Sequence, residues 1–166
     1  MPEAESYDLV LAIGTLDTVN DLPLALRLIR HSMQSDALFI GAIAGGETLP
    51  QLRSAMRAAD SVAGIAAPHV HPRIEAAALS PLLTDAGFIT PIVDVDRVQV
   101  SYASLDRLVS DLRAMGATNI LCSRSAPLSR SARNAAFRRF AEAGNGERTT
   151  ETFEILHFAA WTPKHG

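Results

Sequence analysis

Two histidines and an arginine lie within five residues of one another, and their side chains could carry acid–base or anion-binding chemistry. The stretch 64–73 reads GIAAPHVHPR and holds His69, His71 and Arg73. Histidine exchanges a proton near neutral pH, so His69 is a candidate acid–base or substrate-facing residue. An arginine can hold a carboxylate or phosphate through two hydrogen bonds at once, which makes Arg73 a candidate substrate-binding residue. The alternative for Arg73 is a solvated position on a helix.

The same stretch does not predict a metal site. Histidines two residues apart can share one ion, but no Asp, Glu or Cys completes a convincing ligand pattern nearby. The single cysteine, Cys122, follows two apolar residues and is predicted to be a small buried residue. The serines at positions 123, 125, 129 and 131 form no Gly-x-Ser-x-Gly nucleophile motif, so the sequence assigns no catalytic nucleophile.

A glycine pair follows one of the most apolar stretches. Residues 37–44 are apolar without alternation, which is typical of a strand covered on both faces of an α/β sheet. Gly45 and Gly46 then allow a sharp turn or a close approach to a ligand, and Glu47 or Thr48 could cap the next helix. Small molecules often bind at such a turn in open α/β folds, so these four residues are candidates for substrate binding. A plain strand–helix connection is the alternative.

Three further polar residues follow predicted strands. Asp17 and Asp21 come after the first strand, where they could touch a ligand, although helix capping is favoured for both. Tyr102 follows a later strand and could present its hydroxyl to a pocket or simply pack.

The elements that must position these residues alternate between strands and helices. Strands are predicted at 7–13, 37–44, 89–100 and 151–161, and helices at about 22–33, 48–63, 73–84, 104–115 and 129–143. This order predicts an α/β sheet with crossover connections, formed by a single domain over residues 1–166. Pro91 predicts that the third strand lies at a sheet edge or begins late.

The composition is that of a globular protein. Of the 166 residues, 48% are hydrophobic and 20% charged, which is enough apolar material for a real core. The net charge of −3 argues against nucleic-acid binding. No apolar run reaches the length of a membrane span, and the opening MPEAESYD is too polar for a secretory signal, so a cytoplasmic protein is expected.

The first predicted strand, 7–13, needs a neighbour that covers its apolar surface. Residues 7–13 are apolar on both faces, as in a central strand, yet the sequence offers at most one early neighbour. A bare apolar edge invites pairing with another chain, so we predict a homodimer formed through this strand or another segment that covers it.

Several segments resemble one known family. They are DLVL at 8–11 with VNDLP at 19–23, LFIGA at 38–42, GGETLPQL at 45–52, LRAMGATN at 112–119 and the last strand, 150–161. These segments look like class I S-adenosylmethionine-dependent methyltransferases. The subgroup is the one that combines the malonyl carrier-protein O-methyltransferase with a mitochondrial complex I assembly factor. The likeness covers about residues 7–163, and its specific parts are 45–52 and 115–119.

The resemblance implies a partial, Rossmann-like methyltransferase fold. Residues 7–13 and 37–44 would be the fourth and fifth of seven strands, in the C-terminal half of a mixed sheet with an antiparallel last strand and helices on both faces. Ile13, Gly14, Thr15 and Leu16 would then lie near the methionine part of S-adenosylmethionine. The residues after the fifth strand would form a substrate lid, with 45–48, His69, Arg73 and Tyr102 toward the acceptor.

The sequence also departs from the family. It contains no GxGxxG motif and no phosphate loop, and the family's glycine-rich cofactor loop and ribose-binding acidic residue are not found in it. The resemblance therefore predicts a methyltransferase-like chain that binds the cofactor weakly or not at all by itself. Its partner would be an acyl carrier or a protein substrate. The alternative is a non-catalytic dimerising module that acts as an assembly factor.

Overall fold

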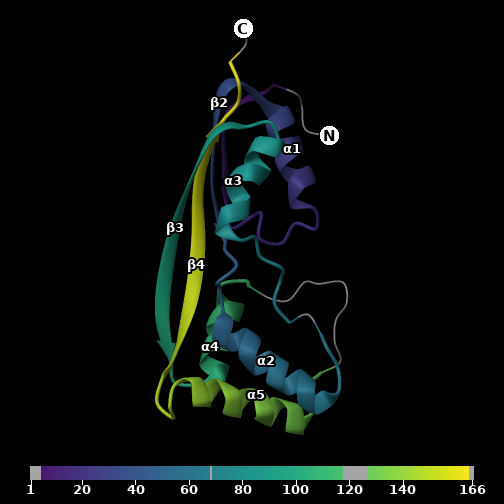
Figure 1. Cartoon of the computed structure of the whole chain (residues 1–166), viewed down its shortest axis with the longest axis vertical. Helices are drawn as coiled ribbons and strands as arrows, with labels where there is room; N and C mark the ends of the chain where they lie inside the picture. The colour runs from purple at the N-terminus through teal and green to yellow at the C-terminus, as the bar shows by residue number, and fades with distance from the viewer. Residues whose placement is uncertain (1–4, 68, 118–126, 165–166) are drawn as a thin grey trace. The chain divides into compact units, whose positions relative to one another are not determined.

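The fold is that of a computed structural model of the chain, which describes residues 5–67, 69–117 and 127–164. The elements along the chain are β1 (Tyr7–Ile13), α1 (Leu22–Ser32), β2 (Met33–Ala44), α2 (Pro50–Ala63), α3 (Ala76–Asp85), β3 (Ile89–Tyr102), α4 (Leu105–Ala114), α5 (Arg130–Ala143) and β4 (Thr149–Trp161) (Figure 1). This order is the predicted one, with two helices in succession before β3 and again before β4.

The described strands form one four-stranded mixed sheet in the order β1-β2-β4-β3. Strand β1 runs parallel to β2, with Leu9 opposite Leu38 and Ile13 opposite Ala42. Strand β4 runs antiparallel to β2, with Leu38 opposite Trp161. The predicted mixed sheet with an antiparallel last strand is confirmed, and β3 lies at the sheet edge as Pro91 predicted.

The described residues fall into two compact units. Unit 1 comprises residues 1–48, 73–97 and 154–166, and unit 2 comprises residues 49–72 and 98–153. Strands β3 and β4 each contribute residues to both units. The single domain predicted over residues 1–166 stays a prediction.

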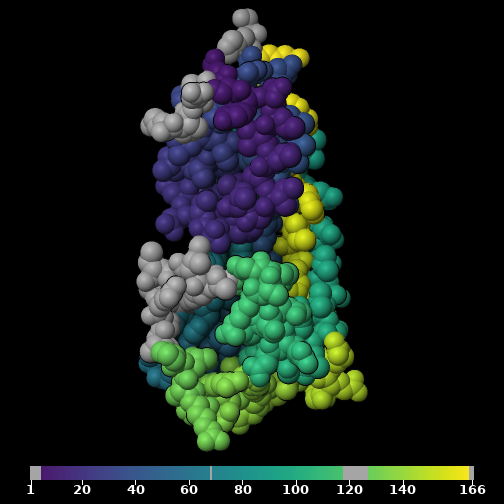
Figure 2. Space-filling model, turned by 180° about the vertical axis from the view of Figure 1, so that it is seen from behind, coloured from purple at the N-terminus to yellow at the C-terminus, as the bar shows by residue number. Residues whose placement is uncertain are grey.

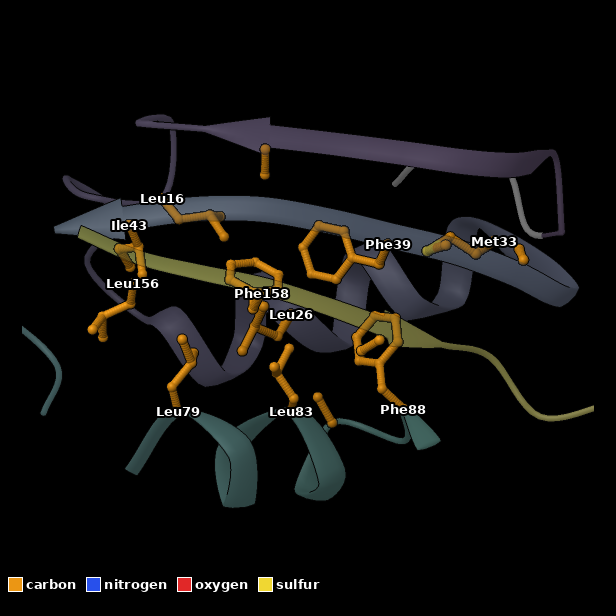
Figure 3. Packing of buried hydrophobic residues seen from close by; sticks show 14 residues of the cluster. Leu16, Leu26, Met33, Phe39, Ile43, Leu79, Leu83, Phe88, Leu156 and Phe158 are labelled. Atoms are coloured by element: carbon orange, nitrogen blue, oxygen red, sulfur yellow. The ribbon is translucent and has the colours of Figure 1, made fainter. Parts of the chain in front are cut away.

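The core of unit 1 lies between one face of the sheet and helices α1 and α3 (Figure 3). Phe39 of β2 stacks on Phe88 with ring centroids 5.1 Å apart and meets Phe158 of β4 edge-on at 5.0 Å. Leu26 from α1 and Leu83 from α3 are fully buried against this aromatic group. Aromatic contacts of this geometry add to the stabilisation that burial of the rings already gives.

The second face of β1 in unit 1 is open. Val10 and Ala12 pack toward the core, whereas the alternating residues Leu9, Leu11 and Ile13 are 47%, 60% and 70% exposed. Alternation along a strand sends these three side chains to the face away from α1 and α3. The helices expected on both faces are therefore seen on one face only among the described residues of this unit.

The described residues of unit 2 form three helices and parts of two strands. Leu52, Ala55 and Ala59 of α2 pack with Leu108 of α4 and Phe140 of α5 in its core. Helices α4 and α5 begin at serine caps, whose side chains accept hydrogen bonds from the amides of residues 107 and 132. Helix α2 begins differently, as described below.

Candidate functional site

The four residues predicted to meet a cofactor lie at the carboxyl end of β1, and they are not equivalent. Ile13, Gly14 and Thr15 are exposed, whereas Leu16 is buried in the core of unit 1. Gly14 has φ +65°, a conformation that favours glycine, and its amide donates to the carbonyl of Ala42 at 2.9 Å. Ile13, Gly14 and Thr15 are therefore accessible to a ligand, whereas Leu16 packs in the core beneath this turn.

Asp17 ties the loop after β1 to the end of β2. One of its carboxylate oxygens accepts hydrogen bonds from the amide of Ala44 at 2.7 Å and from Arg73 at 2.8 Å. The prediction that Asp17 caps a helix is wrong, because its side chain accepts a hydrogen bond from β2 and none from the first turn of α1. Asp21 is the cap of α1, accepting from the amide of Leu24 at 2.8 Å, and that prediction is confirmed.

The glycine pair after β2 is approached by two carboxylates from within the protein. A Cβ added to Gly45 would lie 2.3 Å from Oε1 of Glu154, and one added to Gly46 would lie 2.2 Å from Oε1 of Glu75. The close approach of these side chains leaves little room for a Cβ at either position, whereas the close approach to a ligand that the sequence suggested stays a prediction. The groups that approach are side chains of the same unit.

Glu154 of β4 is buried beside this turn and contacts it through hydrogen bonds. Its side chain is 2% exposed, pairs with Arg97 at 2.8 Å and accepts a hydrogen bond from the amide of Glu47 at 3.3 Å. The hydroxyl of Thr48 donates to the carbonyl of Glu154 at 2.9 Å, so Thr48 holds β4 and does not cap α2. A buried carboxylate in such a position needs both its ion pair and its hydrogen bonds, which makes the turn stiff.

Helix α2 receives its cap from a distant residue. The residue before it, Leu49, has φ +60° and no capping side chain. Instead the fully buried carboxylate of Glu151 accepts hydrogen bonds from the amides of Gln51 at 3.1 Å and Leu52 at 2.8 Å. The expectation that Glu47 or Thr48 caps this helix is wrong, since the helix starts two residues further on.

His69 belongs to unit 2, where it pairs with Asp60 of α2. Its Nε2 lies 2.8 Å from Oδ1 of Asp60, and the amide of Ala67 donates to the other carboxylate oxygen at 3.1 Å. Burial alone would raise the pKa of Asp60, but the hydrogen bonds from His69 and Ala67 outweigh it and lower the pKa. In this pair a carboxylate orients a histidine, a geometry that suits proton transfer and also ties Ala67 and His69 to α2.

Tyr102 is a packed residue of unit 2. Its side chain is 6% exposed and lies in the same core as Leu105 and Phe140. Burial first, and the carboxylate of Asp111 second, raise the pKa of the Tyr102 phenol. Of its two predicted roles, the packed one fits this environment better.

The structure therefore brings together only part of the predicted site. Residues 13–16, 45–48 and Arg73 belong to unit 1, whereas His69 and Tyr102 belong to unit 2. Sequence reasoning missed Asp60, Glu151 and Glu154, although a signal existed for Glu154, which is a charge between Phe153 and Ile155. Cys122, Ser123 and Ser125 lie outside the described residues. Within the described ranges no three His, Cys, Asp or Glu residues group as metal ligands, and no helix has the length and apolarity to cross a membrane.

Comparison with known proteins identifies relatives over almost the whole chain. The chain is 38% identical over 161 residues to the arginine-hydroxylase NDUFAF5, mitochondrial, of Danio rerio, and 36% identical over 159 residues to the Homo sapiens protein of that name. It is 30% identical over 168 residues to the malonyl-[acyl-carrier protein] O-methyltransferase of Xylella fastidiosa. These matches cover 95%, 94% and 98% of the chain but 50%, 46% and 55% of the relatives. The chain thus spans about half the length of the curated relatives it matches. No protein-family model matches the sequence.

Solved structures agree on the fold. A Bacillus halodurans protein assigned as a methyltransferase matches 99% of the chain with a TM-score of 0.63 at 8% identity, and the match covers 74% of that protein. The YcgJ protein of Bacillus subtilis matches 99% with a TM-score of 0.60 at 9% identity, over 67% of its own length. Identities this low show the fold alone.

The chain is a protein of the class I methyltransferase fold, as the resemblance predicted. Within that class its homologues are the arginine-hydroxylase NDUFAF5 and malonyl-[acyl-carrier protein] O-methyltransferase proteins. The expectation of a cytoplasmic protein is wrong on this comparison, because the relatives at 36–38% identity carry mitochondrial names. A short, polar opening sequence is a weak guide to compartment, and that is why the expectation failed.

Proposed function

We propose that this chain takes part in S-adenosylmethionine-dependent methyl transfer and supplies one wall of the cofactor site from the carboxyl end of β1. When bound, the cofactor offers a methyl group to a nucleophile. The observation that supports the proposal is the exposed turn Ile13–Gly14–Thr15, held to β2 through the Gly14 amide and the Ala42 carbonyl. This turn lies at the edge of a parallel strand pair where ligands of open α/β folds bind.

The described residues fit a part of the cofactor and not the whole of it. The exposed backbone of Gly14 leaves room for close approach of a ligand, since a Cβ there would have only Asp17 Oδ2 nearby, at 3.6 Å. One oxygen of the Asp17 carboxylate, Oδ1, is already bonded to the Ala44 amide and to Arg73. Because the sequence also contains no glycine-rich loop, we expect weak binding by this chain alone.

The substrate side of the proposal rests on residues 45–48 and Arg73 of unit 1. In unit 1 the turn is stiffened by Glu154, which would fix the position of the Glu47 and Thr48 backbone for an acceptor. Within unit 2, and separately from this site, the Asp60 carboxylate orients His69 for proton transfer. An acyl carrier or another protein is the proposed acceptor, and Tyr102 has a packing role.

Calorimetric titration with S-adenosylmethionine and S-adenosylhomocysteine tests the cofactor proposal. We expect dissociation constants in the millimolar range for the natural chain and no detectable binding by Gly14→Val. Gly116→Val is the matched control, because Gly116 is also exposed and has a positive φ, +73° against +65°. Equal binding by the natural chain and both variants would refute the proposed site.

A homodimer through β1 remains a second, separate proposal. The observation that favours it is the exposure of Leu9, Leu11 and Ile13 on an edge strand. Light scattering should then report a dimer for the natural chain and a monomer for Leu11→Arg. A monomer at all concentrations would rule this proposal out without touching the cofactor proposal.

A further inference from the structure

The carboxylate of Asp17 uses one of its two oxygens inside unit 1. Oδ1 accepts hydrogen bonds from the amide of Ala44 at 2.7 Å and from Nη1 of Arg73 at 2.8 Å. Within the part of the chain that the structure describes, Oδ2 accepts no hydrogen bond. The Asp17 side chain is 18% exposed, so Oδ2 is an acceptor that is left available next to the surface.

The unused oxygen faces the exposed turn after β1. It lies 3.6 Å from the point that a Cβ on Gly14 would occupy, and apart from the two neighbours of Gly14 no other described residue comes within 4 Å of that point. Ile13, Gly14 and Thr15 are themselves exposed. Figure 2 shows the N-terminal part of unit 1, drawn in purple, at the surface. A ligand that contacts Gly14 therefore comes within reach of Asp17 Oδ2.

The orientation of the Asp17 carboxylate is fixed before any ligand arrives. The amide of Ala44 belongs to the end of β2, and Arg73 forms a largely buried ion pair with Asp17. Both partners bond Oδ1, so they hold the carboxylate and leave Oδ2 beside Gly14. An acceptor that is already in place costs little conformational entropy when it binds a ligand.

The charge of this site favours a cationic donor. A carboxylate oxygen accepts hydrogen bonds only, and it binds a positively charged donor more strongly than a neutral one. Unit 1 contains five basic and twelve acidic residues, so its net charge is −7 and its field attracts positive charge. In S-adenosylmethionine the α-ammonium group is both positively charged and a donor, whereas the sulfonium is charged but carries no N–H.

We propose that Oδ2 of Asp17 accepts a hydrogen bond from the α-ammonium group of the bound cofactor. This inference rests on the proposed cofactor site and adds to it the group that recognises the amino-acid end of the ligand. Asp17 is then a binding residue, and Arg73 is a positioning residue that acts through Asp17 Oδ1. A ribose hydroxyl is the alternative donor, but it is neutral and gains less from the negative field of unit 1.

The test compares S-adenosylhomocysteine with its deamino analogue, in which hydrogen replaces the amino group. Both ligands lack the sulfonium, so the comparison isolates the ammonium group. Dissociation constants are measured on the full natural chain by titrations that follow the amide shifts of residues 13–15, at about 20 mM salt. We expect S-adenosylhomocysteine to bind about tenfold more tightly, because it alone makes the charge-assisted hydrogen bond.

Asp17→Asn should abolish this preference for the ligand with an amino group. An asparagine keeps one oxygen for Ala44 and Arg73, but an NH₂ donor takes the place of Oδ2. Asp21→Asn is the matched control, because it removes the same charge from the same loop and asparagine also caps a helix. It should leave the preference within about twofold of the natural one, since Asp21 caps α1 and Asp17 alone faces Gly14.

Each other outcome would overturn the inference. Equal binding of both ligands by the natural chain would do so while leaving the cofactor site in place. A preference that persists in Asp17→Asn, with both ligands weakened equally, would assign Oδ2 to a hydroxyl. Binding of neither ligand would refute the cofactor proposal and this inference with it. The ligand comparison on the natural chain needs no variant, so it decides the matter even if circular dichroism shows that Asp17→Asn does not fold.

Discussion

Removal of the Glu151 carboxylate should release the first turn of α2. This carboxylate is fully buried and accepts hydrogen bonds from the amides of Gln51, Leu52 and Thr152. A buried donor left without a partner costs about 1–3 kcal/mol, and partial rehydration of the turn recovers some of that. Glu151→Ala should therefore lower the free energy of unfolding by about 2–4 kcal/mol. Glu151→Gln, which keeps one acceptor oxygen, should lower it by about 1–2 kcal/mol.

Hydrogen exchange of single amides is the sharpest assay for this effect. The amides of Gln51 and Leu52 should lose protection at least tenfold in Glu151→Ala, which corresponds to about 1.4 kcal/mol. Thr150→Ala, an exposed change next to it in β4, should leave both amides as protected as in the natural chain. Unchanged protection of Gln51 and Leu52 in Glu151→Ala would refute the capping role.

The same residue gives a pH dependence with a definite sign. Burial raises the pKa of Glu151 above its ordinary value of 4.5, against the opposing hydrogen bonds from Leu52 and the neighbouring amides. The native chain then keeps this proton at a pH where the unfolded chain has lost it. Stability should therefore fall as the pH rises from about 4.5 through the native pKa. Urea unfolding at several pH values should show this slope in the natural chain and not in Glu151→Gln.

Three other perturbations follow from the contacts. Gly45→Ala should cost about 2–4 kcal/mol in urea unfolding, because its Cβ would meet Oε1 of Glu154 at 2.3 Å, and the cost should shrink in a Glu154→Ala background; additive costs would contradict this reasoning. Asp17→Asn should weaken the tie to β2 by about 1–2 kcal/mol in the same assay; an unchanged midpoint would count against the tie. The lowered pKa of Asp60 contributes stability that is present above about pH 3.8 and lost as the pH falls through the native pKa, so Asp60→Asn should show a flatter acid unfolding profile than the natural chain; an identical profile would show that the pair with His69 contributes nothing.

Local patterns predicted most of the fold. Strand β1 has the predicted bounds, because its apolar run is closed by Gly14. Strand β2 begins at Met33, four residues before the predicted start, since the polar residues of 34–36 lie within the strand and Met33 is fully buried. Polar residues at the start of a strand hide it from a pattern that depends on apolar runs.

The site was less predictable, because its contacts join residues far apart in sequence. The amide of Leu52 is capped by Glu151, 99 residues away, and the turn at Gly45 is packed by Glu154. A capping motif within four residues can be read from sequence, as at Asp21, but a cap from another strand cannot. The pairing of His69 with Asp60 was likewise not predicted, although both lie near the end of α2.

The cofactor role of the turn after β1 can be tested directly by residue-resolved amide spectra during titration with S-adenosylmethionine. We predict weak binding with shift changes concentrated at Ile13, Gly14 and Thr15. Shift changes at other amides while these three stay unmoved would contradict the account. So would the absence of any shift change at about 10 mM S-adenosylmethionine, since a dissociation constant of 1 mM corresponds to a binding free energy of about 4 kcal/mol.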